Sequence, residues 1–306
     1  MKKLTVLVLL LALALDLTAQ SFYNRRIDRR WIVSAGTGTA KYFGDLANSG
    51  EIFQSTRYNL AAGLEYRFTS RVSARGTLTY FRIHGDDKDA SSEGRQVRNL
   101  SFVGNNIELS AVGVVQLFEE KGRYYQRPLV NVNVFAGLAL LYFNPKAEIP
   151  ATDHNGNAFA DAGKMTSLRQ YQTEQVKYSP VTLAIPFGLG VKMKISPFFN
   201  IGVNGGYRYT LTDYMDDIST FYPGSAAFTD PLAQALSDRR PEIGLPVLEA
   251  GHIRGNPDYK DGYFIFSVRA EYYLPPDVFG NNNRRGTKRT NYRPQKRPRY
   301  KGGKRR

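Results

Sequence analysis

The sequence predicts an all-β fold: an eight-stranded antiparallel transmembrane outer-membrane β-barrel with long extracellular loops and a disordered basic C-terminal tail. Three observations lead to this prediction. Apolar and polar residues alternate in eight segments, the connections between these segments alternate in length, and the chain begins with an apolar export-type segment. The 306 residues include 20 Tyr, 18 Phe and 28 Gly but only 1 Trp, a composition that favours many strands bordered by aromatic side chains.

The N-terminus has the layout of a secretory signal peptide, which we assign to residues 1–19. Lys2 and Lys3 precede an apolar run, and Ala19 ends the segment. No later apolar run approaches the roughly 20 residues that a membrane helix needs. Residues 20–30 form a short basic lead-in. We expect the barrel to occupy residues 31–274 and a periplasmic tail to occupy residues 275–306.

Each of the eight segments has one apolar face and one face of small, polar and charged residues. Small polar side chains suit a narrow lumen, and apolar faces that end in aromatic residues suit a lipid bilayer. We therefore expect the polar faces to point inward. The predicted strands are residues 31–43, 58–68, 72–80, 106–117, 130–142, 181–195, 199–211 and 264–274.

A soluble all-β barrel or sandwich shows the same alternation, with its apolar face turned inward. The polar faces here consist of Gly, Asn, Ser and Thr with scattered charges of both signs, and the apolar faces carry aromatic residues at their ends. This pattern and the export segment favour the membrane barrel over the soluble alternative.

The connections support the same topology, since transmembrane barrels have short periplasmic turns and long outer loops. With an exported N-terminus that starts inside, the longer connection of each pair falls outside the cell and both termini lie in the periplasm. The connections are residues 44–56, 69–71, 84–98, 119–127, 144–175, 196–197 and 213–261.

Seven of the charged residues on the polar faces are candidates for ion pairs in the lumen. An unpaired charge buried in a filled barrel costs about 3–5 kcal/mol. We expect at least one Arg–Glu contact between strands, with Arg75 or Arg208 as the favoured donor. The full set is Glu65, Arg67, Arg75, Glu108, Arg208, Arg269 and Glu271.

Asp213, Asp216 and Asp217 follow the seventh predicted strand and are weak candidates for a calcium site. The segment lacks the Gly and the downstream Glu of the calcium-binding loop with a fixed register. The alternative is a polar rim that caps the strand through bonds to the loop backbone. The acidic segment 84–89 is a similar and weaker case. We expect neither a metal nor a cofactor.

Catalysis and transport are both disfavoured. The chain has no cysteine, no serine in a G-x-S-x-G context, and three histidines, His84, His154 and His252, which fall in predicted loops far apart in sequence. Eight strands leave an interior wide enough only for side chains, which argues against a general porin. A barrel enzyme or a narrow channel remains an alternative, and no small-molecule substrate is indicated.

The tail is a polycation: residues 284–306 hold 12 Lys or Arg and no acid, so the rest of the chain accounts for only +3 of the +15 formal charge. In the periplasm such a segment attracts acidic proteins, inner-leaflet phospholipids or the peptide carboxylates of the cell wall rather than nucleic acid. The alternative is a solvated tail with no single partner. The candidate partner-binding residues are Arg284, Arg285, Lys288, Arg289, Arg293, Lys296, Arg297 and Arg299.

Six short motifs resemble those of the outer-membrane barrel family of PorG, a component of the type IX secretion system. The resemblance implies an eight-stranded barrel beside a periplasmic ring of lipoprotein and partner subunits, and it marks no catalytic residue. The alternative is an orphan small barrel with surface-binding loops. The motifs are KYFGDL (Lys41–Leu46), IHGDD (Ile83–Asp87), RNLSF (Arg98–Phe102), FNPKA (Phe143–Ala147), IPFGLGVK (Ile185–Lys192) and TDYMDDIS (Thr212–Ser219). The last is the most specific, and its loop residues are Thr212, Asp213, Tyr214, Asp216 and Asp217.

Overall fold

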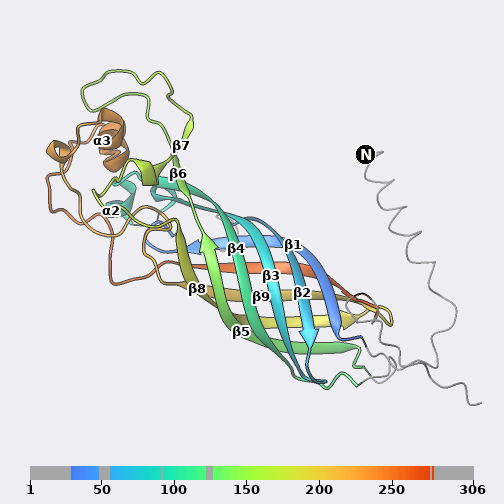
Figure 1. The fold of residues 1–306 in the computed structure, drawn as a ribbon. Coiled ribbons are helices and arrows are strands. Elements are labelled where there is room, and N and C mark those ends of the chain that lie inside the picture. The colour runs from blue at the N-terminus through green and yellow to red at the C-terminus, as the bar shows by residue number, and fades with distance from the viewer. Residues whose placement is uncertain (1–28, 48–55, 91, 122–126, 276–277, 279–306) are drawn as a thin grey trace, which may run out of the picture.

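In the computed structural model, eight long antiparallel strands close into a barrel (Figure 1). The structure describes residues 29–47, 56–90, 92–121, 127–275 and 278. The barrel strands are β1 (Trp31–Phe43), β2 (Arg57–Arg67), β3 (Val72–Asp86), β4 (Ser101–Gln116), β5 (Val130–Tyr142), β8 (Val181–Lys194), β9 (Phe199–Thr210) and β10 (Gly262–Tyr273). The predicted fold class is confirmed. The predicted signal peptide, most of the lead-in and nearly all of the predicted tail lie outside the described residues.

Closure depends on the pairing of β1 with β10. Their antiparallel register runs from Ile32 opposite Tyr273 to Phe43 opposite Gly262. The remaining neighbours pair in the cyclic order β1-β2-β3-β4-β5-β8-β9-β10. Because the ladder returns to its first strand, no barrel strand is left at a free edge.

The predicted bounds of six strands agree with the structure to within about two residues, but β3 and β4 extend farther than predicted. The prediction ended the third strand at Tyr80 and began the fourth at Asn106, whereas β3 continues to Asp86 and β4 begins at Ser101. The polar–apolar alternation fails here because the inward face itself becomes apolar. The start of the predicted loop 84–98 is therefore wrong, because β3 continues to Asp86 and includes His84.

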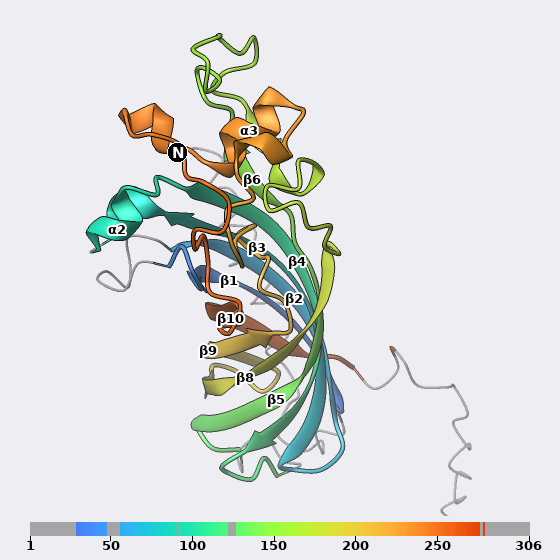
Figure 2. The same cartoon turned by 90° about the vertical axis from the view of Figure 1, so that its left-hand side faces the viewer.

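Two small strands and several short helices lie at the end of the barrel that carries the long loops (Figures 1 and 2). The strand β6 (Pro145–Glu148) extends the sheet beside β4, and β7 (Met165–Ser167) pairs with β6. The α-helices are α2 (Glu93–Gln96) and α3 (Pro231–Ser237), and the 3-10 helices are Asp87–Asp89, Leu168–Gln170, Ser225–Ala227 and Arg240–Ile243. No helix within the described ranges has the length and hydropathy of a membrane span.

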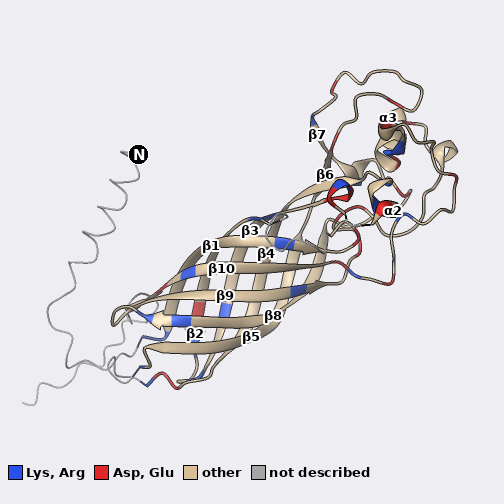
Figure 3. Ribbon diagram, turned by 180° about the vertical axis from the view of Figure 1, so that it is seen from behind, with Lys and Arg blue, Asp and Glu red and all other residues tan. Residues whose placement is uncertain are grey.

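The two faces of the barrel wall differ as the alternation predicts. In β8, for example, Leu183, Leu189 and Val191 are exposed on the outside, whereas Ala184 and Lys192 are buried in the lumen. Charged residues occupy few positions along the strands, and they lie both in the middle of the barrel and towards its ends (Figure 3). The barrel thus has an apolar outer surface and a polar interior.

Aromatic side chains border this apolar surface at both ends. Those at the end with the long loops are Phe43, Tyr58, Tyr142 and Tyr209, and those at the end with the short turns are Phe68, Phe118 and Tyr272. Rings of this kind lie at the two interfaces of a bilayer in transmembrane barrels.

Four of the seven predicted lumen charges meet in two ion pairs between strands. Arg75 on β3 donates from Nε to Glu65 on β2 at 2.9 Å, and Arg208 on β9 donates from Nε to Glu108 on β4 at 3.2 Å. Tyr263 also donates to Glu108, at 2.7 Å. All four charged side chains are buried, so each pair compensates charges that water does not reach.

The other three predicted lumen residues do not pair with one another. Arg67 lies 3.6 Å from Glu120, which belongs to the turn after β4. Glu271 accepts a hydrogen bond from Asn200. No carboxylate of the described residues forms an ion pair with Arg269.

Glu120 closes the turn end of the lumen. Its carboxylate accepts from Lys192 Nζ and from the Tyr273 hydroxyl, both at 2.8 Å. Arg127 lies on the Tyr273 ring and donates to Asn200 and to the carbonyl oxygen of Pro197. Burial alone would raise the pKa of the Glu120 carboxyl, but the surrounding cations outweigh it and lower the pKa to about 2. The sequence pattern placed Lys192 inside but gave no partner for it.

Removal of the Arg208 side chain should destabilise the barrel more than removal of Lys194. Arg208→Ala leaves the buried Glu108 carboxylate without its cation, at a cost of about 3–5 kcal/mol. Lys194 is only partly buried and donates to a backbone carbonyl near the turns, so Lys194→Ala should cost far less. Urea unfolding followed by gel mobility would measure both, and equal midpoints would contradict this account of the lumen.

Candidate functional site

The long loops form an outer cap, which we define as the described residues of loops 44–56, 87–100, 143–180 and 211–261. Below the cap, the upper lumen is filled by an apolar cluster that sequence reasoning missed. Phe81 and Tyr263 stack at 4.6 Å between ring centroids, and Phe102 meets Tyr42 edge-on at 5.0 Å. Ile83 is fully buried beside them. These inward residues explain why β3 and β4 continue beyond the polar part of the lumen.

Asp87 joins three loops of the cap. This fully buried carboxylate accepts from Arg98 Nε at 2.7 Å and from Arg95 Nε at 3.2 Å. Arg98 in turn donates to the carbonyl oxygens of Asp45 and Arg254. The bidentate arginine fork thus holds three loops together around one buried charge. The sequence singled out this acidic segment only as a weak metal candidate.

Gly85 permits the close contact between loop 44–56 and β3. A Cβ atom at this position would lie 2.7 Å from Leu46 Cβ and 2.8 Å from a ring carbon of Phe102. A glycine is therefore required for Leu46 to be fully buried against β3.

A second buried ion pair joins the two longest loops. Glu174 accepts from Arg254 Nη1 at 2.8 Å and from the backbone N–H groups of Ser219 and Thr220. Arg254 also donates to the carbonyl oxygen of Asp217 at 2.6 Å. Both charged side chains are almost completely buried, and neither was identified from the sequence because their partners are distant along the chain.

The motif loop Thr212–Asp217 lies at the centre of the cap. Asp216 accepts from the backbone of Ile218, and Asp217 accepts from Tyr178 at 2.6 Å and from Thr173. Asp217 has a φ of 68°, in the left-handed region that Asp tolerates better than most residues. The loop therefore turns back upon itself while its carboxylates bind neighbouring loops.

Asp213, Asp216 and Asp217 do not converge upon one point. Asp213 accepts from Ser219 at 2.8 Å, while Asp216 and Asp217 face different partners. In the described part of the chain, no group of three acidic or histidine side chains is arranged to hold a metal ion. The geometry corresponds to a polar rim whose carboxylates bond to the loop backbone and to neighbouring side chains.

Burial changes the proton affinity of these carboxylates. It raises the pKa of Asp213 to about 7, although the hydrogen bond from Ser219 offsets part of the effect. Burial also raises the pKa of Asp217 to about 6 against the opposing attraction of Arg254. The pKa of Asp216 is raised well above its ordinary value by burial and by the charge of Asp45.

Two histidines have backbone partners. His84 Nδ1 lies 3.3 Å from the carbonyl oxygen of Phe102, and His154 Nε2 lies 2.9 Å from that of Asp238.

The eight basic tail residues proposed to bind a partner, Arg284 to Arg299, lie outside the described residues.

A family model described as "Domain of unknown function (DUF6089)" matches residues 165–228, which hold β7, β8, β9 and the motif loop. No curated protein matches the chain.

Solved structures of small barrels are similar to this chain at low identity. Neisserial surface protein A (NspA) is 10% identical, with 80% of this chain and 97% of that chain covered and a TM-score of 0.39. OprG from Pseudomonas aeruginosa is 10% identical, with 82% and 98% covered and a TM-score of 0.38. Ail of Yersinia pestis is 10% identical, with 80% and 97% covered and a TM-score of 0.35.

The closed ends of the lumen limit what the barrel can do. The aromatic cluster fills the outer part, and the Glu120 network fills the turn end. A cavity between them admits little more than a water molecule. The arrangement therefore offers a rigid wall and an ordered outer cap rather than a passage.

The outer cap should be more stable in mild acid than at neutral pH. The ordinary Asp pKa lies near 4, whereas in the cap the pKa is about 7 for Asp213 and about 6 for Asp217. The closed cap therefore binds protons more tightly than the opened cap, and its stability falls as the pH rises from about 4 to about 7. Protection factors for hydrogen exchange of the backbone amides of residues 211–223 should be larger at pH 5 than at pH 8.

Two variants test this pH dependence. Asp213→Asn should flatten it, whereas Asp161→Asn should leave it unchanged because Asp161 is an exposed acid of the same cap. Protection that increases towards pH 8 would contradict the assignment.

Proposed function

We propose that this protein is a non-enzymatic outer-membrane barrel that serves as a structural and interaction component of the cell envelope. The observation that carries the proposal is the combination of an apolar outer wall with a lumen closed at both ends. An outward apolar surface of this extent, bordered by aromatic residues, is suited to lipid. A closed lumen leaves the outer cap and the periplasmic side as the surfaces available to partners.

A non-enzymatic role is supported by the surroundings of the histidines. Nucleophilic or acid–base catalysis requires a base within reach of a nucleophile or a bound substrate. Among the described residues, the hydrogen-bond contacts of the His84 and His154 rings are with backbone carbonyl oxygens and not with a serine or threonine hydroxyl.

Within this role, we propose an association with the type IX secretion machinery through a periplasmic ring or scaffold protein. The support is the resemblance of six motifs to the PorG family, together with the basic tail after β10. The tail would bring its positive charge to the periplasmic side if both termini face the periplasm, and an acidic partner would be attracted over about one Debye length, roughly 8 Å.

A second candidate function is the binding of a partner at the cell surface. The cap exposes Phe221, Ile253 and Tyr259, of which Ile253 is 74% and Tyr259 is 73% exposed. Phe221 and Ile253 lie opposite each other in an isolated antiparallel bridge. A surface partner would be lost on Ile253→Ser, whereas a periplasmic partner would be retained.

Membrane insertion predicts a strong effect of charge on the barrel wall. Leu189 lies near the middle of β8 and is 61% exposed, so Leu189→Arg would place a cation in the bilayer at a cost of about 2–4 kcal/mol. Ile253→Arg is the matched control because Ile253 is exposed in the cap. Urea unfolding in phospholipid vesicles measures both, and equal stabilities would argue against a lipid-facing wall.

The tail hypothesis predicts that deletion of residues 281–306 leaves a folded barrel but abolishes crosslinking to a periplasmic protein. The matched control keeps the full length and replaces the eight candidate basic residues with Gln. Loss of the crosslink in both variants, and its weakening by salt in the parent protein, would be expected for electrostatic binding. Unchanged crosslinks and unchanged secretion in the deletion variant would refute this role for the tail.

A further inference from the structure

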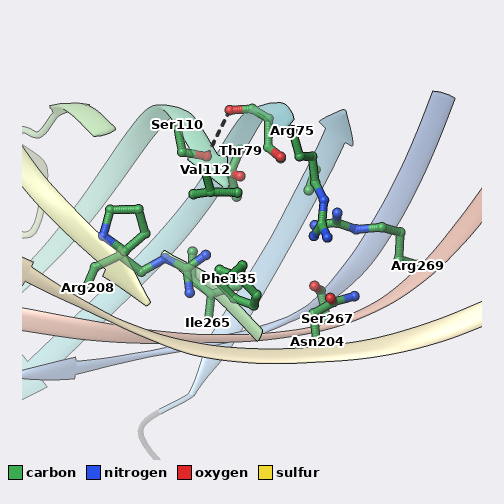
Figure 4. A pocket seen from close by; sticks show the side chains of 13 residues that line it. Arg75, Thr79, Ser110, Val112, Phe135, Asn204, Arg208, Ile265, Ser267 and Arg269 are labelled. Atoms are coloured by element: carbon green, nitrogen blue, oxygen red, sulfur yellow. Dashed lines mark hydrogen bonds between the residues drawn. The ribbon is translucent and has the colours of Figure 1, made fainter. Parts of the chain in front are cut away.

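A small cavity lies in the middle of the lumen and is bordered by three arginines, Arg75, Arg208 and Arg269 (Figure 4). The cavity has a volume of about 20 Å³. Hydroxyl and amide side chains, among them Ser267 and Asn204, and apolar side chains, among them Phe135, complete its lining, and no carboxylate belongs to it. Figure 4 shows the guanidinium groups of Arg75 and Arg269 turned towards each other.

The three arginines are not equally compensated. Arg75 and Arg208 each use Nε for an ion pair with a glutamate, and Arg208 Nη1 also donates to the carbonyl oxygen of Gly206. Arg269 is only 7% exposed, and its Nη1 is buried with no hydrogen-bond acceptor among the described residues. Glu271, two residues away on the same face, accepts instead from Asn200.

Arg269 thus lacks an acceptor at Nη1, and its charge is only partly compensated: Glu271 and Glu65 attract it, but burial and the repulsion from Arg75 outweigh that attraction. A guanidinium group stays protonated in proteins, so it cannot relieve its burial by losing the proton. A water molecule would accept the hydrogen bond, but it is neutral and would add nothing to the partial compensation that Glu271 and Glu65 provide. An anion supplies both an acceptor and a negative charge, and its attraction to three guanidinium groups is strong where water is scarce.

We propose that this cavity binds one small monovalent anion of the halide class, held by Arg269 together with Arg75 and Arg208. The volume admits a single particle of about the size of a water molecule, which fits chloride or bromide and excludes phosphate or sulfate with their four oxygens. The hydroxyl groups of Ser267 and Thr79 can rotate to donate to the same ion. The ion would be a structural part of the lumen, because the aromatic cluster and the Glu120 network close both ends.

The site should be visible in crystals of the full-length protein grown in detergent with sodium bromide. We expect one anomalous bromide peak within hydrogen-bond distance of Arg269 Nη1. The peak should disappear in R269M, which removes the charge with little change in volume. It should remain in R67M, the matched control, because Arg67 lies at the turn end of the lumen and does not line the cavity. Absence of the peak in the parent protein, or its survival in R269M, would overturn the proposal.

A second measurement can be made on the parent protein alone, so it tests the proposal even if R269M does not fold. A ligand that binds only the folded state raises the unfolding midpoint with its concentration. The midpoint of the parent protein should therefore be higher in sodium bromide or chloride than in sodium gluconate at the same ionic strength. R67M should keep this difference and R269M should lose it. Equal midpoints of the parent protein in halide and gluconate would refute the site.

Discussion

The closure of the sheet by β1 and β10 is the constraint on which the rest of this structure depends. A closed antiparallel ladder satisfies the backbone hydrogen bonds of every barrel strand and separates two faces that alternate along each of them. One face must then be apolar where it meets lipid, and the other must fill a narrow interior. With eight strands that interior holds side chains and little else. The position of every lumen charge follows from this geometry.

The buried charges of the lumen are compensated in different ways along the barrel axis. The turn end has the Glu120 network, the middle has the pairs of Arg75 with Glu65 and of Arg208 with Glu108, and the outer part replaces charge with stacked aromatic rings. Arg269 and Glu271 form no ion pair with any described side chain; Glu271 accepts a hydrogen bond from Asn200, whereas Arg269 Nη1 has no acceptor. The proposed halide would complete the series by supplying the missing negative charge within the lumen.

The outer cap, like the lumen, contains buried ion pairs. Its loops bury apolar residues such as Leu46, Met215 and Ile218, and they are also joined by buried ion pairs around Asp87 and Glu174. The motif loop contributes acids whose pKa is raised by burial, which is why we expect the stability of the cap to depend on pH as well as on packing. An ordered cap above a closed lumen suits a protein that is recognised by partners, and this is the role we propose on both sides of the membrane.

The sequence by itself determined the number of barrel strands, their inward and outward faces and the alternation of short turns with long loops. It could do so because side chains of a strand alternate with a fixed period of two and lipid imposes one polarity on the outer face. Only the tertiary structure decided the continuation of β3 to Asp86, the partners of Asp87 and Glu174, and the isolation of Arg269. These features depend on contacts between residues far apart in the chain, for which a local pattern holds no signal, and in the upper lumen packing against the cap replaced the polar–apolar alternation altogether.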